Sequence, residues 1–234
     1  KLLFTLSFAI GVLAIPQNTS AQNSSNGDHK ISFGVRAGMN ISSMGGDFKK
    51  TFSESTDLNS KVGFNIGAIV DIPVWKELYV QPGLFFTTKG AKSKFAESNE
   101  EDGETFKYEE KGTFNAMYLE IPILLSYRFN LNENIKWHIN FGPYIALGIG
   151  GKAKFENTEN EEKEEADFFG KSEDSFGFNR FDAGLSFGTG LSFKHYYIGL
   201  QYELGLTNAA NKDYWGEKTS IKMNNLAISL GYNF

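Results

Sequence analysis

Apolar residues recur at every second position over eight segments of this chain. In the first segment, "ISFGVRAGMNIS", Ile31, Phe33 and Val35 share one face. Gly34 and Arg36 share the other face. A period of two is that of a β-strand, whose side chains point alternately to opposite sides. The pattern predicts strands at about 31–43, 61–72, 78–90, 114–129, 135–151, 177–193, 196–207 and 221–234.

The connections between these segments alternate in length. Short connections contain "PVWKE", "NLNEN" and "KH", and long ones cover about 44–60, 91–112, 153–175 and 208–220. Short periplasmic turns and long extracellular loops are typical of outer-membrane barrels. We therefore expect an all-β fold: an eight-stranded antiparallel transmembrane β-barrel in an up-and-down meander, with both termini periplasmic.

Glycine decides which face of the strands is inside. The chain has 25 glycines but only 5 prolines, and many glycines lie on the polar face of the segments. Glycine weakens a solvated strand surface, whereas in a narrow barrel it makes room for bulkier neighbours. We expect the polar face to line the lumen and the apolar face to meet lipid. A soluble, lipocalin-like carrier is the alternative with the same alternation.

A charged residue interrupts the apolar segment "YLEIPILLSYRF". Glu120 is out of phase with Leu119 and Ile121, so it is expected to point into the lumen and to require a partner there. The predicted polar network of the lumen comprises Arg36, Gln81, Glu120, Arg180, Asp182, Gln201 and Glu203. Its two arginines are expected to face its three carboxylates and to plug the barrel. The phase before Tyr118 suggests a bulge near that residue.

The beginning of the chain differs from the rest. A lysine precedes an apolar run of about 14 residues, and "PQNTSAQ" follows, which is typical of a secretory signal. A membrane-spanning helix needs about 20 apolar residues, so an anchor is disfavoured. We expect a signal peptide at 1–22 and the barrel at 23–234.

Composition excludes several classes of protein. Without cysteine, the chain has no disulfide scaffold, thiolate metal site or cysteine nucleophile. A net charge of −5 argues against nucleic acid as a partner. "GLSFG" matches a hydrolase motif, but its Ser186 lies in mid-strand and not at a strand–turn–helix junction. The three histidines are far apart in the sequence. We expect no enzyme activity, no cofactor and no metal.

The long connections carry charge and aromatic rings. The connection 153–175 has nine acidic residues against three lysines. A cation or a partner could contact Glu159, Glu161, Glu162, Glu164 and Glu165 there, and a solvated loop is the alternative. Aromatic residues are expected to cover the mouth of the barrel or to hold a partner: Phe106, Tyr108, Phe155, Phe168 and Phe169.

Several segments together resemble a known family. "FGVRAGMNIS", "YLEIPILLSYRF", "FDAGLSFGTGLSF", "YELGLTN" and "LGYNF" are similar to the outer-membrane β-barrel domain family, whose members are also labelled porin-family or PorT-like. The resemblance implies an eight-stranded barrel in the cell outer membrane. Phe234 matches the terminal aromatic residue that such barrels present to the assembly machinery. One branch of the family serves type IX secretion.

These observations predict a non-enzymatic outer-membrane barrel with a plugged lumen, displayed acidic loops and a structural or surface-interaction role. Outer-membrane lipid is the expected partner of the wall, and a protein partner could contact the loops or the wall. The alternatives are an accessory subunit of a secretion or membrane-assembly complex and a narrow porin-type channel. Outside such a complex, the chain is expected to be a monomer.

Overall fold

Eight antiparallel strands form a closed ring. The computed structural model describes residues 30–46, 56–101, 104–157, 163–170, 175–216 and 219–234, so the expected signal peptide at 1–22 lies outside the described residues. The ring contains β1 (Ser32–Gly46), β2 (Thr56–Trp75), β3 (Leu78–Glu101), β4 (Glu104–Asn130), β5 (Ile135–Asn157), β8 (Phe181–Phe193), β9 (Tyr196–Gly205) and β10 (Ile221–Asn233). Pairing of β1 with β10 and of β4 with β5 closes it. The predictions of an all-β chain and of eight hydrogen-bonded strands in one ring are confirmed.

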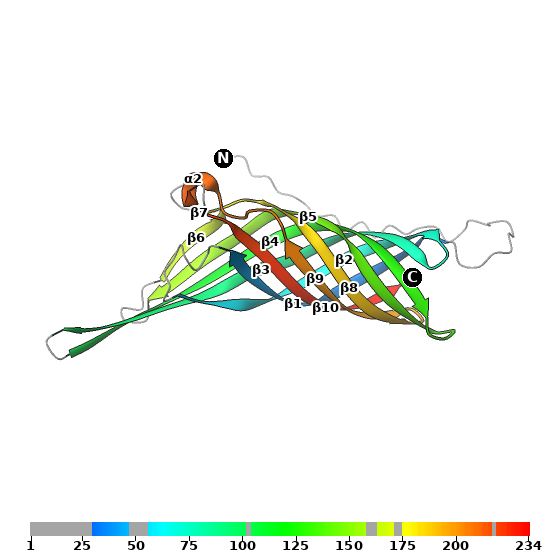
Figure 1. Cartoon of the computed structure of the whole chain (residues 1–234), viewed down its shortest axis with the longest axis horizontal. Helices are drawn as coiled ribbons and strands as arrows, with labels where there is room; N and C mark the ends of the chain where they lie inside the picture. Colours follow the sequence, from blue (N-terminus) through cyan, green and yellow to red (C-terminus); the bar gives the residue numbers. More distant parts are fainter. Residues whose placement is uncertain (1–29, 47–55, 102–103, 158–162, 171–174, 217–218) are drawn as a thin grey trace, which may run out of the picture.

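One end of the ring carries additional structure. The short strand β6 (Lys163–Phe169) extends the sheet beyond β5, and β7 (Ser175–Phe178) pairs with it in parallel. A four-residue helix, α2 (Lys212–Trp215), lies at the same end, and the C-terminus lies at the other (Figure 1). No helix among the described residues is both long and apolar enough to cross a membrane.

β3 and β4 extend well beyond the predicted strands. They remain paired from Leu78 opposite Tyr127 to Glu101 opposite Glu104, and Figure 1 shows this hairpin projecting past the ring. The sequence analysis assigned 91–112 to a loop because that stretch is rich in charge. The structure corrects this assignment. Cross-strand pairs of opposite charge, such as Lys94 with Glu109 at 3.2 Å, support a solvated sheet there.

The two faces of the ring differ in polarity. Ile66 and Leu147 are 55% and 54% exposed on the outward face, whereas Glu120 is 3% exposed on the inward face. Large apolar residues are exposed outward on all eight strands of the ring. Contiguous apolar surface of this extent marks an interaction site for lipid or protein, since water-soluble monomers rarely expose it.

β4 keeps a single phase along its length. Tyr118 is buried inside like Glu120, and Leu119 between them is exposed. The pairing with β5 shifts by one residue between Met117 and Tyr118, which leaves Ile149 of β5 as the extra residue. The irregularity near Tyr118 thus changes the phase of the neighbouring strand, β5.

Aromatic side chains cover the interior at the end that carries β6 and β7. Phe168 stacks on Phe178 with 4.4 Å between the ring centroids, and Phe155 stacks on Phe176 at 5.0 Å. Phe169 packs edge-on against Tyr118 at 5.5 Å. Phe155, Phe168 and Phe169 are three of the five rings expected over the mouth. The side chains of the other two, Phe106 and Tyr108, lie outside the described residues.

Close contact between β1 and β10 depends on a glycine. A Cβ atom on Gly38 would lie 2.0 Å from the backbone oxygen of Ile228, whereas a Cβ on Gly45 would have its nearest neighbour at 3.7 Å. We expect Gly38→Ala to lower the free energy of unfolding by about 1–3 kcal/mol, because backbone must move. The measurement is urea unfolding followed by tryptophan fluorescence.

The matched control is Gly45→Ala in the same strand, which is expected to unfold at nearly the midpoint of the parent protein. Equal midpoints for the two variants would contradict the close approach of β1 and β10 at Gly38.

Candidate functional site

The interior holds a lysine surrounded by three carboxylates. The Nζ atom of Lys89 lies 2.7 Å from Oε2 of Glu120, 2.9 Å from Oε2 of Glu203 and 3.7 Å from Oδ2 of Asp182. The Lys89 side chain is completely buried. These four residues, which we call the Lys89 cluster, come from β3, β4, β8 and β9. Desolvated charges of this kind are tolerated only when they are paired and hydrogen-bonded.

Neutral groups complete the coordination of the carboxylates. Tyr144 and Thr207 donate hydrogen bonds to Asp182 at 3.2 and 2.8 Å, and Asn225 donates to Glu203 at 3.0 Å. The ammonium group of Lys89 also lies 4.5 Å from the ring centroid of Tyr144. These contacts distribute the excess of negative charge over several donors.

A second polar cluster lies in the interior toward the short turns. Arg128 forms an ion pair with Asp71, which also accepts a hydrogen bond from Gln81 at 2.7 Å. Its guanidinium lies 3.9 Å from the ring centroid of Tyr79. Arg36 stacks in the same way at 4.2 Å on Tyr197, a further residue of this end.

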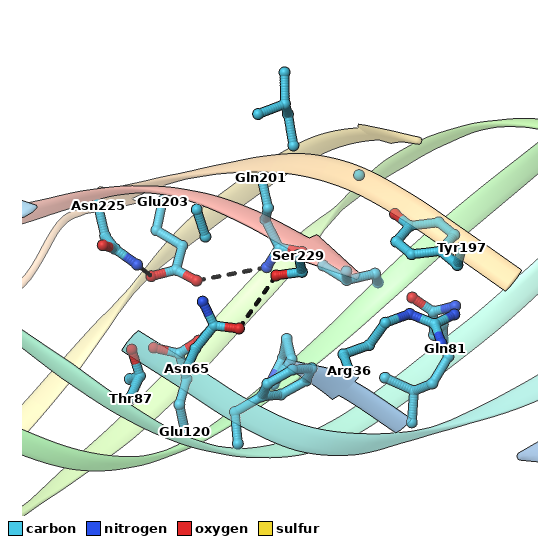
Figure 2. A pocket seen from close by; sticks show the side chains of 17 residues that line it. Arg36, Asn65, Gln81, Thr87, Glu120, Tyr197, Gln201, Glu203, Asn225 and Ser229 are labelled. Carbon is cyan, nitrogen blue, oxygen red and sulfur yellow. Dashed lines mark hydrogen bonds between the residues drawn. The ribbon is translucent and has the colours of Figure 1, made fainter. Parts of the chain in front are cut away.

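A small cavity separates these two clusters. It offers about 40 Å³ to water molecules, which is room for about three. Figure 2 shows Glu203 with its hydrogen-bonding neighbours on one side of the cavity and Arg36 with Tyr197 on the other. Two buried polar atoms at its wall, Nδ2 of Asn65 and Oγ1 of Thr87, have no protein partner. The cavity therefore suits a few hydrogen-bonded waters.

The structure redistributes the polar network that the sequence predicts. Glu120, Asp182 and Glu203 do meet, but their cation is Lys89 and not an arginine. Gln201 donates a weak hydrogen bond to Glu203 at 3.5 Å. The other predicted members, Gln81 and Arg36, belong to the second cluster instead.

Arg180 lies outside the interior. Its side chain is exposed, just before β8 begins, and it donates a hydrogen bond to the backbone oxygen of Gly148 at 2.9 Å. Sequence analysis omitted Lys89 and Arg128, although Lys89 shares the inward phase of Gln81 in the segment "QPGLFFTTKG". The shared phase could have identified Lys89 as an inward-facing residue.

Only part of the predicted acidic site can be located. Glu159, Glu161 and Glu162 lie outside the described residues, whereas Glu164 and Glu165 belong to β6. Lys154 bonds Glu165 at 2.8 Å, and this hydrogen bond lowers the pKa of the Glu165 carboxyl. Within the described ranges, no group of three or more acidic or histidine side chains is placed to hold a metal ion.

The interior also contains a serine–histidine pair. Nε2 of His138 lies 2.9 Å from Oγ of Ser192. Both side chains are buried, and Nδ1 of His138 has no hydrogen-bond partner, so no third group orients the imidazole as in a catalytic triad. Ser186 of the hydrolase-like motif is also buried, in the middle of β8. This geometry does not match a nucleophile site.

Comparison with known proteins identifies one matching family model, "Outer membrane protein beta-barrel domain", which covers residues 20–211. Among solved structures, Ail, the attachment invasion locus protein of Yersinia pestis, is 17% identical with a TM-score of 0.38, and the alignment covers 87% of this chain and 98% of that one. Ail in complex with the heparin analogue sucrose octasulfate is 16% identical with a TM-score of 0.34, covering 88% and 99%. Neisserial surface protein A is 12% identical with a TM-score of 0.42, covering 88% and 99%. A search of curated proteins found no significant match.

Removal of Lys89, the cation of the Lys89 cluster, is expected to reduce the stability of the protein strongly. We expect Lys89→Met to lower the free energy of unfolding by about 3–5 kcal/mol, because three buried carboxylates lose their counter-ion. Urea unfolding of the refolded protein in lipid vesicles measures this difference.

Lys154→Met is the control, since Lys154 also pairs with a glutamate but is 57% exposed. The control is expected to leave the free energy of unfolding nearly unchanged. If the two variants were equally stable, Lys89 would not neutralise the interior.

Proposed function

Because this chain belongs to the outer membrane protein β-barrel domain family, we propose that it spans the outer membrane as a non-enzymatic barrel with a closed interior. In this arrangement the short turns and the C-terminus face the periplasm. The end that carries β6, β7 and α2 faces the outside of the cell and contacts other macromolecules at the cell surface.

The observation that carries this proposal is the apolar outward face of the ring. Exposed side chains such as Ile66, Ile123 and Leu226 lie on strands around the whole ring, while the charged residues of the clusters point inward. A water-soluble carrier would have the reverse arrangement. In a closed barrel all backbone hydrogen bonds are made between strands, which is the condition for a sheet to cross lipid.

The contents of the interior support a closed barrel over a channel. The Lys89 cluster, the Arg128–Asp71 pair and the aromatic cover lie at three successive levels. The cavity between the two polar clusters is small, with room for about three waters. An eight-stranded barrel has an interior that side chains can fill, and the side chains of these clusters are of the size that this requires.

The sheet that β5 forms with β6 beyond the ring supports a role at the cell surface. Its outward face carries ion pairs between neighbouring strands, such as Lys152 with Asp167 at 2.9 Å and Lys163 with Glu156 at 3.2 Å. A charged sheet beyond the membrane is suited to contact other macromolecules. An accessory role in a secretion complex stays a prediction, which a partner co-purifying at equal stoichiometry from native membranes would support.

Membrane insertion predicts a specific behaviour in fractionation. We expect the protein to stay in the membrane pellet after carbonate washing and to be released by detergent. Unboiled samples from the detergent extract should migrate differently on denaturing gels from boiled ones, because the closed ring resists the detergent until it is heated. Release by carbonate, or identical migration, would contradict a closed transmembrane barrel.

A closed interior predicts the absence of steady conductance. We expect planar bilayers containing the purified protein to show the same current as bilayers without it, while a sixteen-stranded porin in the same bilayer conducts. Reproducible ohmic steps that scale with the amount of this protein would favour the narrow channel instead.

A further inference from the structure

Lysines gather on the outward face of the sheet just above the apolar wall. Lys61 lies on β2 within the register shift between Ser60 and Asn65, so it does not follow the simple alternation of that strand. Its ammonium reaches Asn115, which faces outward between the buried Phe114 and Ala116.

Lys92 is exposed on the neighbouring strand β3. Register places Lys92 opposite Asn59, two residues from Lys61. Burial and the neighbouring charge of Lys92 both lower the pKa of the Lys61 ammonium group. We call these two residues the lysine pair.

The lysine pair differs from the other lysines of this face. Lys94, Lys111, Lys152 and Lys154 each form an ion pair with a glutamate or aspartate. Among the described residues, neither member of the lysine pair has a carboxylate within 4.0 Å. Lys61 donates to the amide oxygen of Asn115 at 2.8 Å, a neutral acceptor that leaves its charge uncompensated.

The position of Lys61 is fixed by its neighbours. A Cβ atom on Gly90 would lie 3.2 Å from Cδ of Lys61, so the lysine stem crosses β3 at a glycine. Its ammonium then reaches Asn115, which pairs with Gly90 from the strand beyond. A lysine held in this way presents its charge with less loss of side-chain entropy on binding.

Apolar surface continues directly from the lysine pair. Val62 and Phe64 are 58% and 51% exposed, and the ring of Phe64 packs on Phe86 of β3 at 5.6 Å. Positive charge therefore lies at the edge of a surface that suits acyl chains. A lipid with an anionic headgroup would fit this surface, because its headgroup would lie at the lysine pair and its acyl chains on the apolar wall.

We propose that the lysine pair binds the phosphate of an outer-leaflet lipid whose acyl chains lie along Val62, Phe64 and Phe86. The inference rests on the proposed orientation of the barrel in the membrane. A phosphate would relieve the repulsion between the two lysines and accept charge-assisted hydrogen bonds from both. Continuity with the apolar wall favours a lipid over a free phosphate ion.

The test uses the whole protein refolded in detergent micelles with phosphatidylcholine. Phosphatidic acid is added, and native mass spectrometry measures how much lipid stays bound. We expect one phosphatidic acid to bind in preference to phosphatidylcholine. The double variant Lys61→Gln/Lys92→Gln should weaken that binding by roughly tenfold or more, since each lysine near a membrane surface contributes about fivefold to anionic lipid binding.

The matched control is Lys94→Gln/Lys154→Gln, which removes the same charge from paired lysines of the same face. It should bind phosphatidic acid like the parent protein. Equal losses in both double variants would contradict a site at the lysine pair and indicate attraction by net charge alone. Inorganic phosphate that competes at the same concentration as the lipid would contradict the lipid assignment.

The two proposals fail in distinguishable ways. A protein that does not insert into vesicles of phosphatidylcholine contradicts the proposed function itself. A protein that inserts and shows the gel shift, but binds phosphatidic acid and phosphatidylcholine alike, contradicts only the lysine-pair site.

Discussion

The arrangement of the interior depends on the ion pairing of the buried Lys89 ammonium group with three carboxylates. Three carboxylates from three other strands meet it, at 2.7 to 3.7 Å. A ring of eight strands with an apolar outward face must place its polar side chains inside, and a charge inside must be paired. Because two of its partners come from β8 and β9, which do not pair with β3, the cluster links strands that are not neighbours in the sheet. It therefore constrains the cross-section of the ring as well as its charge.

The remaining levels of the interior follow from the same constraint. Toward the short turns, Arg128 is neutralised by Asp71 and covered by Tyr79. Toward the other end, aromatic rings such as Phe168 and Phe178 stack on each other, and the Lys89 side chain is completely buried. Exclusion of water strengthens the ion pairs and makes an unpaired charge more costly. The burial of the Lys89 cluster and the pairing of its charges therefore depend on each other.

Alternation of polarity in the sequence was sufficient to predict the ring, its two faces and the inward position of Glu120. The alternation was not sufficient to predict the partners of Glu120. Which inward side chains come into contact depends on the stagger between the strands, and alternation does not give that stagger. Arg180 illustrates the limit: its phase was extrapolated from β8, but it lies just before that strand begins and is exposed. The extended hairpin was missed because charged residues alternating on a solvated sheet resemble a loop in composition. Register and cross-strand pairs such as Lys94 with Glu109 distinguish the two.

The most direct test of the central interaction is a double-mutant cycle between Lys89 and Glu203, measured as free energies of unfolding in lipid vesicles. The four proteins are the parent, Lys89→Met, Glu203→Gln and the double variant. If the 2.9 Å ion pair neutralises the interior, the double variant should be more stable than the sum of the single losses predicts, with a coupling energy of about 1–3 kcal/mol. Additive losses would show that the two side chains do not stabilise each other, and would contradict the account given for the interior.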